Sequence, residues 1–235
     1  MKRLKVTHFL QDDGCCSVAA CATAANYYNP EIDYRYAKKV ADKIQKDIND
    51  GLDSGEIGIL LNRLGFHKVT IVTSDLDLFD YEWEHYGRRK LTETMRLAIS
   101  RKKCKISKEQ LMRFYEWYTD RRYENIIKIG LNFGTYIKKK LNRRKPVIIS
   151  FNWSMFMKFP KQAEKGGADP INGDEEFHSV VLNGYDKNGV WVVDSHQESY
   201  KYKRKKYRRG FYKMSWENLF TCMGSGDVYL PEDYY

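Results

Sequence analysis

Hydrophobic residues recur at helical spacing through the first third of the chain. Residues 16–28 alternate small and apolar side chains in a way that predicts a helix able to pack closely. Apolar residues four apart predict a second helix over residues 33–48, and residues 54–64 predict a third that ends at Gly65. A β-rich run at residues 69–72 follows, so this part is predicted to be three helices and a strand.

Residues 75–143 have a different pattern, because charged and aromatic side chains dominate there. Apolar stripes at helical spacing predict helices over residues 108–121 and 124–141, and such stripes usually face a core. We expect residues 1–235 to form a single domain, with residues 75–143 as a helical insertion within it.

Strand signals dominate after residue 144. Residues 146–151 form a buried-strand pattern, and residues 152–176 read as a long irregular loop of the kind that often forms a lid or binding edge. Two further strands are predicted at residues 178–185 and 190–194, joined by a tight turn at Asn188-Gly189.

The end of the chain predicts a basic strand, a short helix from Ser215 and a final strand near residues 227–230. Helices therefore come first and a mostly antiparallel sheet follows. This order indicates an α+β fold.

The chain has 235 residues and a formal net charge of +10. Much of the positive charge lies in residues 88–105 and in the run from Lys201 to Arg209. A basic surface attracts polyanions and anionic membranes without sequence specificity, so a polyanion contact through Lys201 to Arg209 is one expectation. A solvated basic face is the simpler explanation.

Several classes of protein are disfavoured. The sequence has no run of 18 apolar residues, which argues against a membrane span, and no apolar stretch follows the basic N-terminus as a secretory signal requires. Five cysteines without a CxxC pair argue against a disulfide framework and against zinc. We therefore expect a cytoplasmic protein that needs no metal or organic cofactor.

A cysteine at the start of the first predicted helix carries the strongest chemical signal. Cys16 occupies the first turn, where the helix dipole lowers the pKa of a thiol and favours the nucleophilic thiolate. Cys15 is the alternative, one residue outside the helix. Gln11, just upstream, is a candidate oxyanion donor together with the backbone N–H of the nucleophile. The remaining cysteines are expected to be small buried residues: Cys21, Cys104 and Cys222.

A histidine and an aspartate far downstream could complete such a site. His178 begins an apolar strand and is the candidate base, and Asp194 ends the neighbouring strand of the predicted hairpin. The turn should bring the two together, so that the carboxylate fixes the imidazole tautomer. A structural histidine and a turn-capping aspartate are the alternatives for these two positions.

These residues occur in two ordered blocks. The first comprises Gln11, Cys16-Ser17-Val18-Ala19 and Asn26-Tyr27-Tyr28. The second comprises His178-Ser179-Val180-Val181-Leu182-Asn183-Gly184-Tyr185-Asp186 and Val192-Val193-Asp194. Together they resemble the papain-like peptidases of the bacteriocin-processing, double-glycine-leader type and their standalone relatives, over residues 5–72 and 144–230. Counting back from Asn26 selects Cys16 rather than Cys15.

The resemblance implies a papain-like fold, in which a helix bearing the nucleophile packs on a mostly antiparallel sheet. The chain departs from the family pattern at Ser17, which replaces a glycine, in a Gln-to-Cys gap one residue shorter, and at Ser195-His196 after Asp194. Both of the first two changes could shift the oxyanion site.

The resulting hypothesis is a cysteine-dependent hydrolase of a peptide or amide, with Cys16, His178, Asp194 and Gln11 as its site. The basic surface and the loop at residues 152–177 suggest an acidic or extended polypeptide substrate. Two alternatives stay open: an acyl transferase with the same residues, and a non-catalytic papain-like module that binds nucleic acid or a protein partner through its basic surface.

Overall fold

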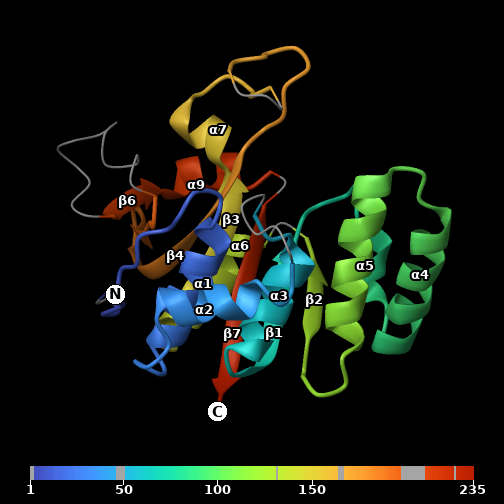
Figure 1. The fold of residues 1–235 in the computed structure, drawn as a ribbon, viewed down its shortest axis with the longest axis horizontal. Helices are drawn as coiled ribbons and strands as arrows, with labels where there is room; N and C mark the ends of the chain where they lie inside the picture. Colours follow the sequence, from blue (N-terminus) through green and yellow to red (C-terminus); the bar gives the residue numbers. More distant parts are fainter. Residues whose placement is uncertain (1–2, 46–50, 131, 164–166, 197–209, 225) are drawn as a thin grey trace.

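The computed structural model describes residues 3–45, 51–130, 132–163, 167–196, 210–224 and 226–235. Its centre is a seven-stranded sheet with the strand order β2-β1-β7-β3-β4-β5-β6 (Figure 1). Among the described strands, β1 and β2 are parallel and every other neighbouring pair is antiparallel. The α+β prediction with a mostly antiparallel sheet is therefore confirmed.

The strands are β1 (Phe66–Thr73), β2 (Ile126–Ile129), β3 (Val147–Asn152), β4 (Phe177–Asp186), β5 (Gly189–Val193), β6 (Phe211–Ser215) and β7 (Asp227–Tyr234). The helices are α1 (Cys16–Asn26), α2 (Tyr34–Ala41), α3 (Ser54–Arg63), the short 3-10 helix η2 (Tyr81–His85), α4 (Arg88–Arg101), α5 (Lys105–Thr119), α6 (Phe133–Asn142), α7 (Trp153–Met157) and α9 (Trp216–Cys222).

The sheet buries both of its faces. Successive strand residues point to opposite faces, and the core divides accordingly. Ile148, Val181 and Tyr229 pack with α1, α3 and α5, whereas their neighbours along the same strands pack with α6 and α9. Each central strand therefore carries an unbroken apolar run, as expected for a sheet covered on both sides.

Helix α1 is the innermost helix. Its residues from Ser17 to Ala25 are all buried, and it contacts α2, α3, β3 and β4. The small alanine side chains predicted for this helix allow that close approach. The contacts of α1 with β4 place the N-terminus of this helix beside the start of that strand.

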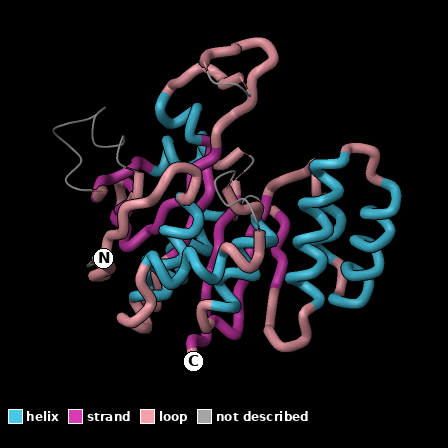
Figure 2. The backbone as a smooth tube through the Cα atoms, viewed as in Figure 1, coloured by secondary structure: helices cyan, strands magenta, loops and turns pink. Residues whose placement is uncertain are grey.

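Helix α3 connects the sheet to the α4–α5 pair, which Figure 2 shows as two helices set beside the sheet. Asp53 and Glu56 form a reciprocal capping box at the start of α3. A Cβ added at Gly55 would lie 2.5 Å from the backbone of Arg113, and one at Gly58 would lie 2.7 Å from the Trp117 ring. Glycine at these two positions permits α3 and α5 to pack in contact.

The prediction of a single helix over residues 124–141 is wrong. Residues Ile126–Ile129 form strand β2, which pairs in parallel with β1, and α6 begins only at Phe133. The isoleucines favour a strand when an open sheet edge is available, and Gly130 adopts a φ of +140° that ends the strand. That residues 75–143 are an insertion within a single domain remains a prediction.

Other sequence predictions are refined. The loop predicted at 152–176 contains α7, whose first turn is capped by Asn152 accepting a bond from the Met155 N–H. Cys104, expected to be buried, is exposed at the start of α5. The run from Lys201 to Arg209 lies outside the described residues. Within the described part of the chain, every helix is too short or too polar to traverse a bilayer.

Candidate active site

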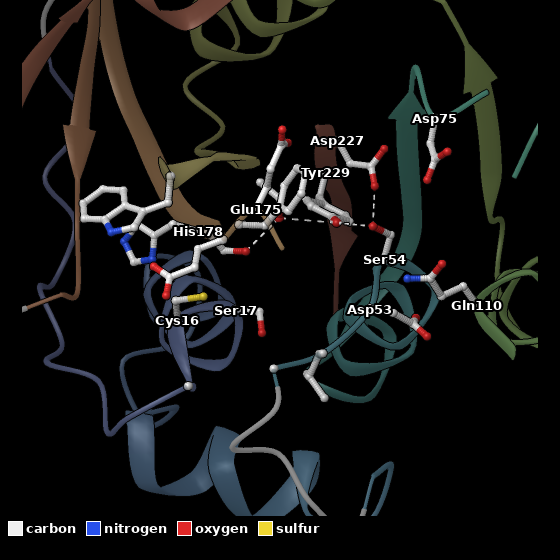
Figure 3. A pocket seen from close by; sticks show the side chains of 18 of the residues that line it. Cys16, Ser17, Asp53, Ser54, Asp75, Gln110, Glu175, His178, Asp227 and Tyr229 are labelled. Carbon is white, nitrogen blue, oxygen red and sulfur yellow. Dashed lines mark hydrogen bonds between the residues drawn. The ribbon is translucent and has the colours of Figure 1, made fainter. Parts of the chain in front are cut away.

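Cys16 and His178 meet where the first turn of α1 lies against the start of β4 (Figure 3). The Cys16 side chain is half-buried and hydrogen bonds to the His178 side chain. Ser179, the next residue of β4, also hydrogen bonds to the Cys16 sulfur through its backbone and its side chain. The sulfur is thus surrounded by groups that favour a thiolate.

His178 is held on its other side by Asp194. Its Nε2–H donates to Asp194 Oδ1 at 2.8 Å, and both side chains are buried. The carboxylate of Asp194 also accepts from the His196 backbone N–H at 2.8 Å and from the Tyr212 hydroxyl at 3.0 Å. Because Nε2 carries the proton toward Asp194, the remaining ring nitrogen faces Cys16.

These contacts set the protonation states of the three groups. Burial alone would raise the pKa of Cys16, but the hydrogen bond and charge of His178 and the contacts with Ser179 outweigh it, so the pKa is lowered. Burial opposes protonation of His178, yet the Asp194 carboxylate raises its pKa to about 10. The arrangement therefore favours a thiolate–imidazolium pair over two neutral groups.

The structure separates the two adjacent cysteines. Cys15 is fully buried, its thiol hydrogen bonds to Tyr34, and burial raises its pKa. Cys16 faces His178 and lines the pocket. Of the two, only Cys16 has the environment of a nucleophile.

Gln11 lies beside the same pocket, held by residues that follow Asp194. Its backbone N–H donates to the Ser195 carbonyl at 3.2 Å, and its side-chain Oε1 accepts from Ser195 Oγ at 2.7 Å. Because Ser195 occupies the amide oxygen, the amide nitrogen is the group of Gln11 left to donate to a ligand.

Three supporting residues were not identified from the sequence. The Trp153 ring lies with its centroid 4.4 Å from that of His178, Tyr212 bonds to Asp194, and the His8 ring donates to the Asp194 backbone carbonyl at 2.7 Å. Trp153 fell in the segment predicted to be a loop. In the sequence, the position of Trp153 directly after a buried strand is the feature that could have drawn attention to it, but this position does not reveal what the ring contacts.

The site opens into a pocket of about 810 Å³. Cys16 and His178 line one part of it, and Ser54, Asp227 and Tyr229 line another (Figure 3). Gln11 is also among the lining residues. A cavity of this size accommodates several residues of an extended peptide.

Comparison with known proteins places this geometry in context. The sequence model of the Peptidase_C39 like family matches residues 3–221. No curated protein sequence matches the chain.

Two solved structures are similar. One is xylellain, a cysteine protease from Xylella fastidiosa, with 13% identity, a TM-score of 0.50 and coverage of 100% of this chain and 84% of that one. The other is a double glycine motif protease from an AMS/PCAT transporter in complex with its leader peptide, with 14% identity, a TM-score of 0.43 and coverage of 98% and 94%. The predicted family resemblance and the papain-like fold are confirmed.

Proposed function

The chain belongs to the Peptidase_C39 like family of cysteine peptidase-like hydrolases, and we propose that it cleaves a peptide or amide bond with Cys16 as nucleophile. The observation that supports this assignment best is the hydrogen bond between Cys16 and His178, with Asp194 behind the histidine. A thiol nucleophile, a histidine base and a carboxylate that orients the base form the usual catalytic arrangement of a thiol hydrolase.

In the first step the Cys16 thiolate attacks the substrate carbonyl carbon, and a C–S bond forms as the carbonyl π electrons move to oxygen. His178, as imidazolium, then donates its proton to the leaving amine as the C–N bond breaks. In the second step neutral His178 takes a proton from water while the water oxygen attacks the thioester carbonyl carbon. The C–S bond then breaks, which releases the carboxylic acid and restores the Cys16 thiolate beside the protonated His178. Asp194 keeps the imidazole in the required tautomer throughout.

Stabilisation of the tetrahedral oxyanion is assigned to Gln11. Its amide nitrogen and the backbone N–H of Cys16, at the first turn of α1, are donors of the required kind. Ser195 positions the Gln11 amide, which offers a reason for a serine to follow Asp194 here.

A thiol nucleophile requires reduced cysteines, and Cys15, Cys16, Cys21, Cys104 and Cys222 are all free. We therefore propose that the protein works in a reducing compartment such as the cytoplasm.

The test is hydrolysis of a peptide library by the wild-type chain, Cys16→Ala and Cys15→Ala. We expect Cys16→Ala to lose at least about a thousandfold in kcat/KM and Cys15→Ala to keep most activity. Hydrolysis retained in Cys16→Ala would contradict the assignment. Product analysis with an added amine distinguishes hydrolysis from acyl transfer, because a new amide appears only in the second case.

A further inference from the structure

The pocket beside Cys16 is acidic although the chain is basic. Among the described residues that line it there is no lysine or arginine, whereas the whole chain has a net charge of +10. Six carboxyl groups line it: those of Asp53, Asp75, Asp77, Glu175, Glu176 and Asp227. An acidic lining alone does not identify a ligand site, so the partners of these groups must be considered.

Two of these carboxyl groups, those of Asp53 and Asp75, have a structural role in the fold. Asp53 caps α3 by accepting from the Glu56 N–H at 2.9 Å. Asp75 accepts from the N–H groups of Asp77 and Leu78 at 2.9 and 3.2 Å, which fixes the turn after β1. Both have backbone donors as partners.

Asp227 is different. It is 6% exposed, and its neighbours among the described residues are the hydroxyls of Ser54, Thr73 and Tyr229. None of these reaches its Oδ1 with hydrogen-bond geometry, so that oxygen has no donor within the described part of the chain. No ion pair to Asp227 occurs among the described residues either. A buried carboxylate oxygen without a donor costs free energy, and a native site that keeps one usually has a use for it.

The strand register connects Asp227 to the reactive cysteine. Ser179 of β4 pairs with Ser150 of β3, and Ser150 pairs with Asp227 of β7. These residues form a polar row across an otherwise apolar sheet face. Neighbouring strands lie about 4.8 Å apart, so Asp227 is about 10 Å from Ser179, which touches the Cys16 sulfur.

Hydroxyl groups fill the space along this row. Ser179 Oγ and Ser150 Oγ are 2.7 Å apart, and the Tyr229 hydroxyl lies 2.7 Å from Ser54 Oγ, which donates to Asp227. The bonds joining Tyr229, Ser54 and Asp227 are dashed in Figure 3, which also places Asp75 on the same side of the pocket. The polar row therefore runs from Ser179, which contacts Cys16, to the carboxyl groups of Asp227 and Asp75.

The protonation of Asp227 agrees with a missing partner. Burial raises its pKa to about 6, and the nearby charge of Asp75 adds to the effect despite the hydroxyls of Ser54 and Thr73. A cation placed beside it would favour the carboxylate. No group of metal-ligating side chains suited to a metal ion occurs among the described residues, so an organic cation is the better match.

We propose that Asp227, with Asp75 beside it, is the specificity site for a lysine or arginine side chain of the peptide substrate. This proposal rests on the proposed function. An extended peptide advances about 3.3 Å per residue, so a distance of about 10 Å places the cationic residue within two or three residues of the bond that Cys16 attacks. The surface charge had suggested an acidic substrate, whereas the pocket favours a basic one.

The experiment compares three peptides that differ at one position two residues from the scissile bond: lysine, its neutral isostere norleucine, and glutamate. Wild-type enzyme should cleave the lysine peptide with a kcat/KM about tenfold to a hundredfold above that of the norleucine peptide, mainly through KM. Glutamate should be the poorest. Moving the lysine one residue at a time along the peptide locates its position relative to the cleaved bond.

Asp227→Asn should reduce the lysine-to-norleucine ratio to within about threefold of one, and Asp42→Asn, an exposed aspartate outside the pocket, should leave the ratio unchanged. Cleavage with no preference for lysine at any position would overturn the inference while leaving the hydrolase assignment intact. A ratio unaltered in Asp227→Asn, or cleavage stimulated only by free polyamines, would overturn it as well. Failure to cleave any peptide would instead contradict the proposed function.

Discussion

Asp194 and Asp227 are two aspartates that are both nearly inaccessible to solvent. Asp194 contacts His178, and Asp227 lines the pocket beside it, yet the pKa of the first is lowered and that of the second is raised. Burial raises the pKa of each, but the charge of His178 and three hydrogen bonds lower that of Asp194. Among the described residues Asp227 has hydroxyl partners and no cationic one, and burial raises its pKa to about 6. The comparison shows that the partners, rather than burial, decide whether a buried carboxyl group is charged.

The same contrast separates their roles. Asp194 accepts three hydrogen bonds and holds His178, the proposed base, in place. Asp227 has one carboxylate oxygen without a donor among the described residues, and the proposed substrate would supply that donor. The variants of Asp194 and Asp227 described below test this difference directly, and the others test the surroundings of the two groups.

The largest effect is expected for Asp194→Ala. An alanine removes both the acceptor of the His178 Nε2–H and the charge that stabilises the imidazolium, so kcat should fall by about a thousandfold or more. The pH profile should also change, because loss of the carboxylate lowers the pKa of His178 and raises that of Cys16, and the pH range of activity narrows from both sides. The measurement is kcat/KM against pH. Tyr212→Phe, which removes one hydroxyl bond from the same carboxylate, should have a smaller effect.

Gln11→Ala is expected to lower kcat by about a hundredfold to a thousandfold, since it removes the proposed oxyanion donor. Ser195→Ala is the matched variant, because it removes the bond that orients the Gln11 amide without removing the amide itself. It should cost less than Gln11→Ala. Equal kcat values for Gln11→Ala and wild type would exclude this residue from the oxyanion site.

Asp227→Asn should stabilise the fold at alkaline pH, in contrast to Asp194→Ala, which should destabilise it because it leaves three buried donors without an acceptor. The folded-state pKa of Asp227, about 6, exceeds its ordinary value of 3.8, so the charged group costs the folded state at most about 3 kcal/mol above pH 6. This cost disappears as the pH falls toward 4. Urea unfolding at about pH 8 and pH 4.5 measures the difference, and a stabilisation that did not shrink on acidification would contradict this explanation.

A smaller effect is expected at α3, the helix that carries Ser54. Gly58→Ala should destabilise the fold by about 1–3 kcal/mol, because the added methyl group meets the Trp117 ring. Gly87→Ala is the control, since nothing lies within 4 Å of a Cβ at that position. Thermal unfolding of the two variants distinguishes a specific clash from a general effect of replacing glycine.

The sequence was sufficient to select Cys16, His178 and Asp194 as candidates that the fold brings into contact, because residue type and order indicate their chemistry. Cys16 begins an alanine-rich helix, His178 lies on β4, and Asp194 directly follows β5, which one tight turn joins to β4. These local relations do not depend on knowing the rest of the fold.

Asp227 could not be identified in the same way. Its burial depends on the insertion of β7 between β1 and β3, two strands that are distant from it in the sequence. The isoleucines of β2 were misread for a related reason, since a short apolar run fits a helix or a strand until a pairing edge is known. Long-range pairing, rather than local pattern, decides both cases.

The central claim is that His178 keeps the Cys16 thiol ionised. The most direct measurement is the pH dependence of Cys16 alkylation by iodoacetamide, followed by mass spectrometry of the labelled peptide, in wild type and in His178→Asn. We predict rapid labelling of wild-type Cys16 at pH values well below those at which an ordinary thiol reacts, and a shift to higher pH in His178→Asn. Labelling of Cys16 that follows an ordinary thiol in the wild type, or is unchanged in His178→Asn, would contradict the account.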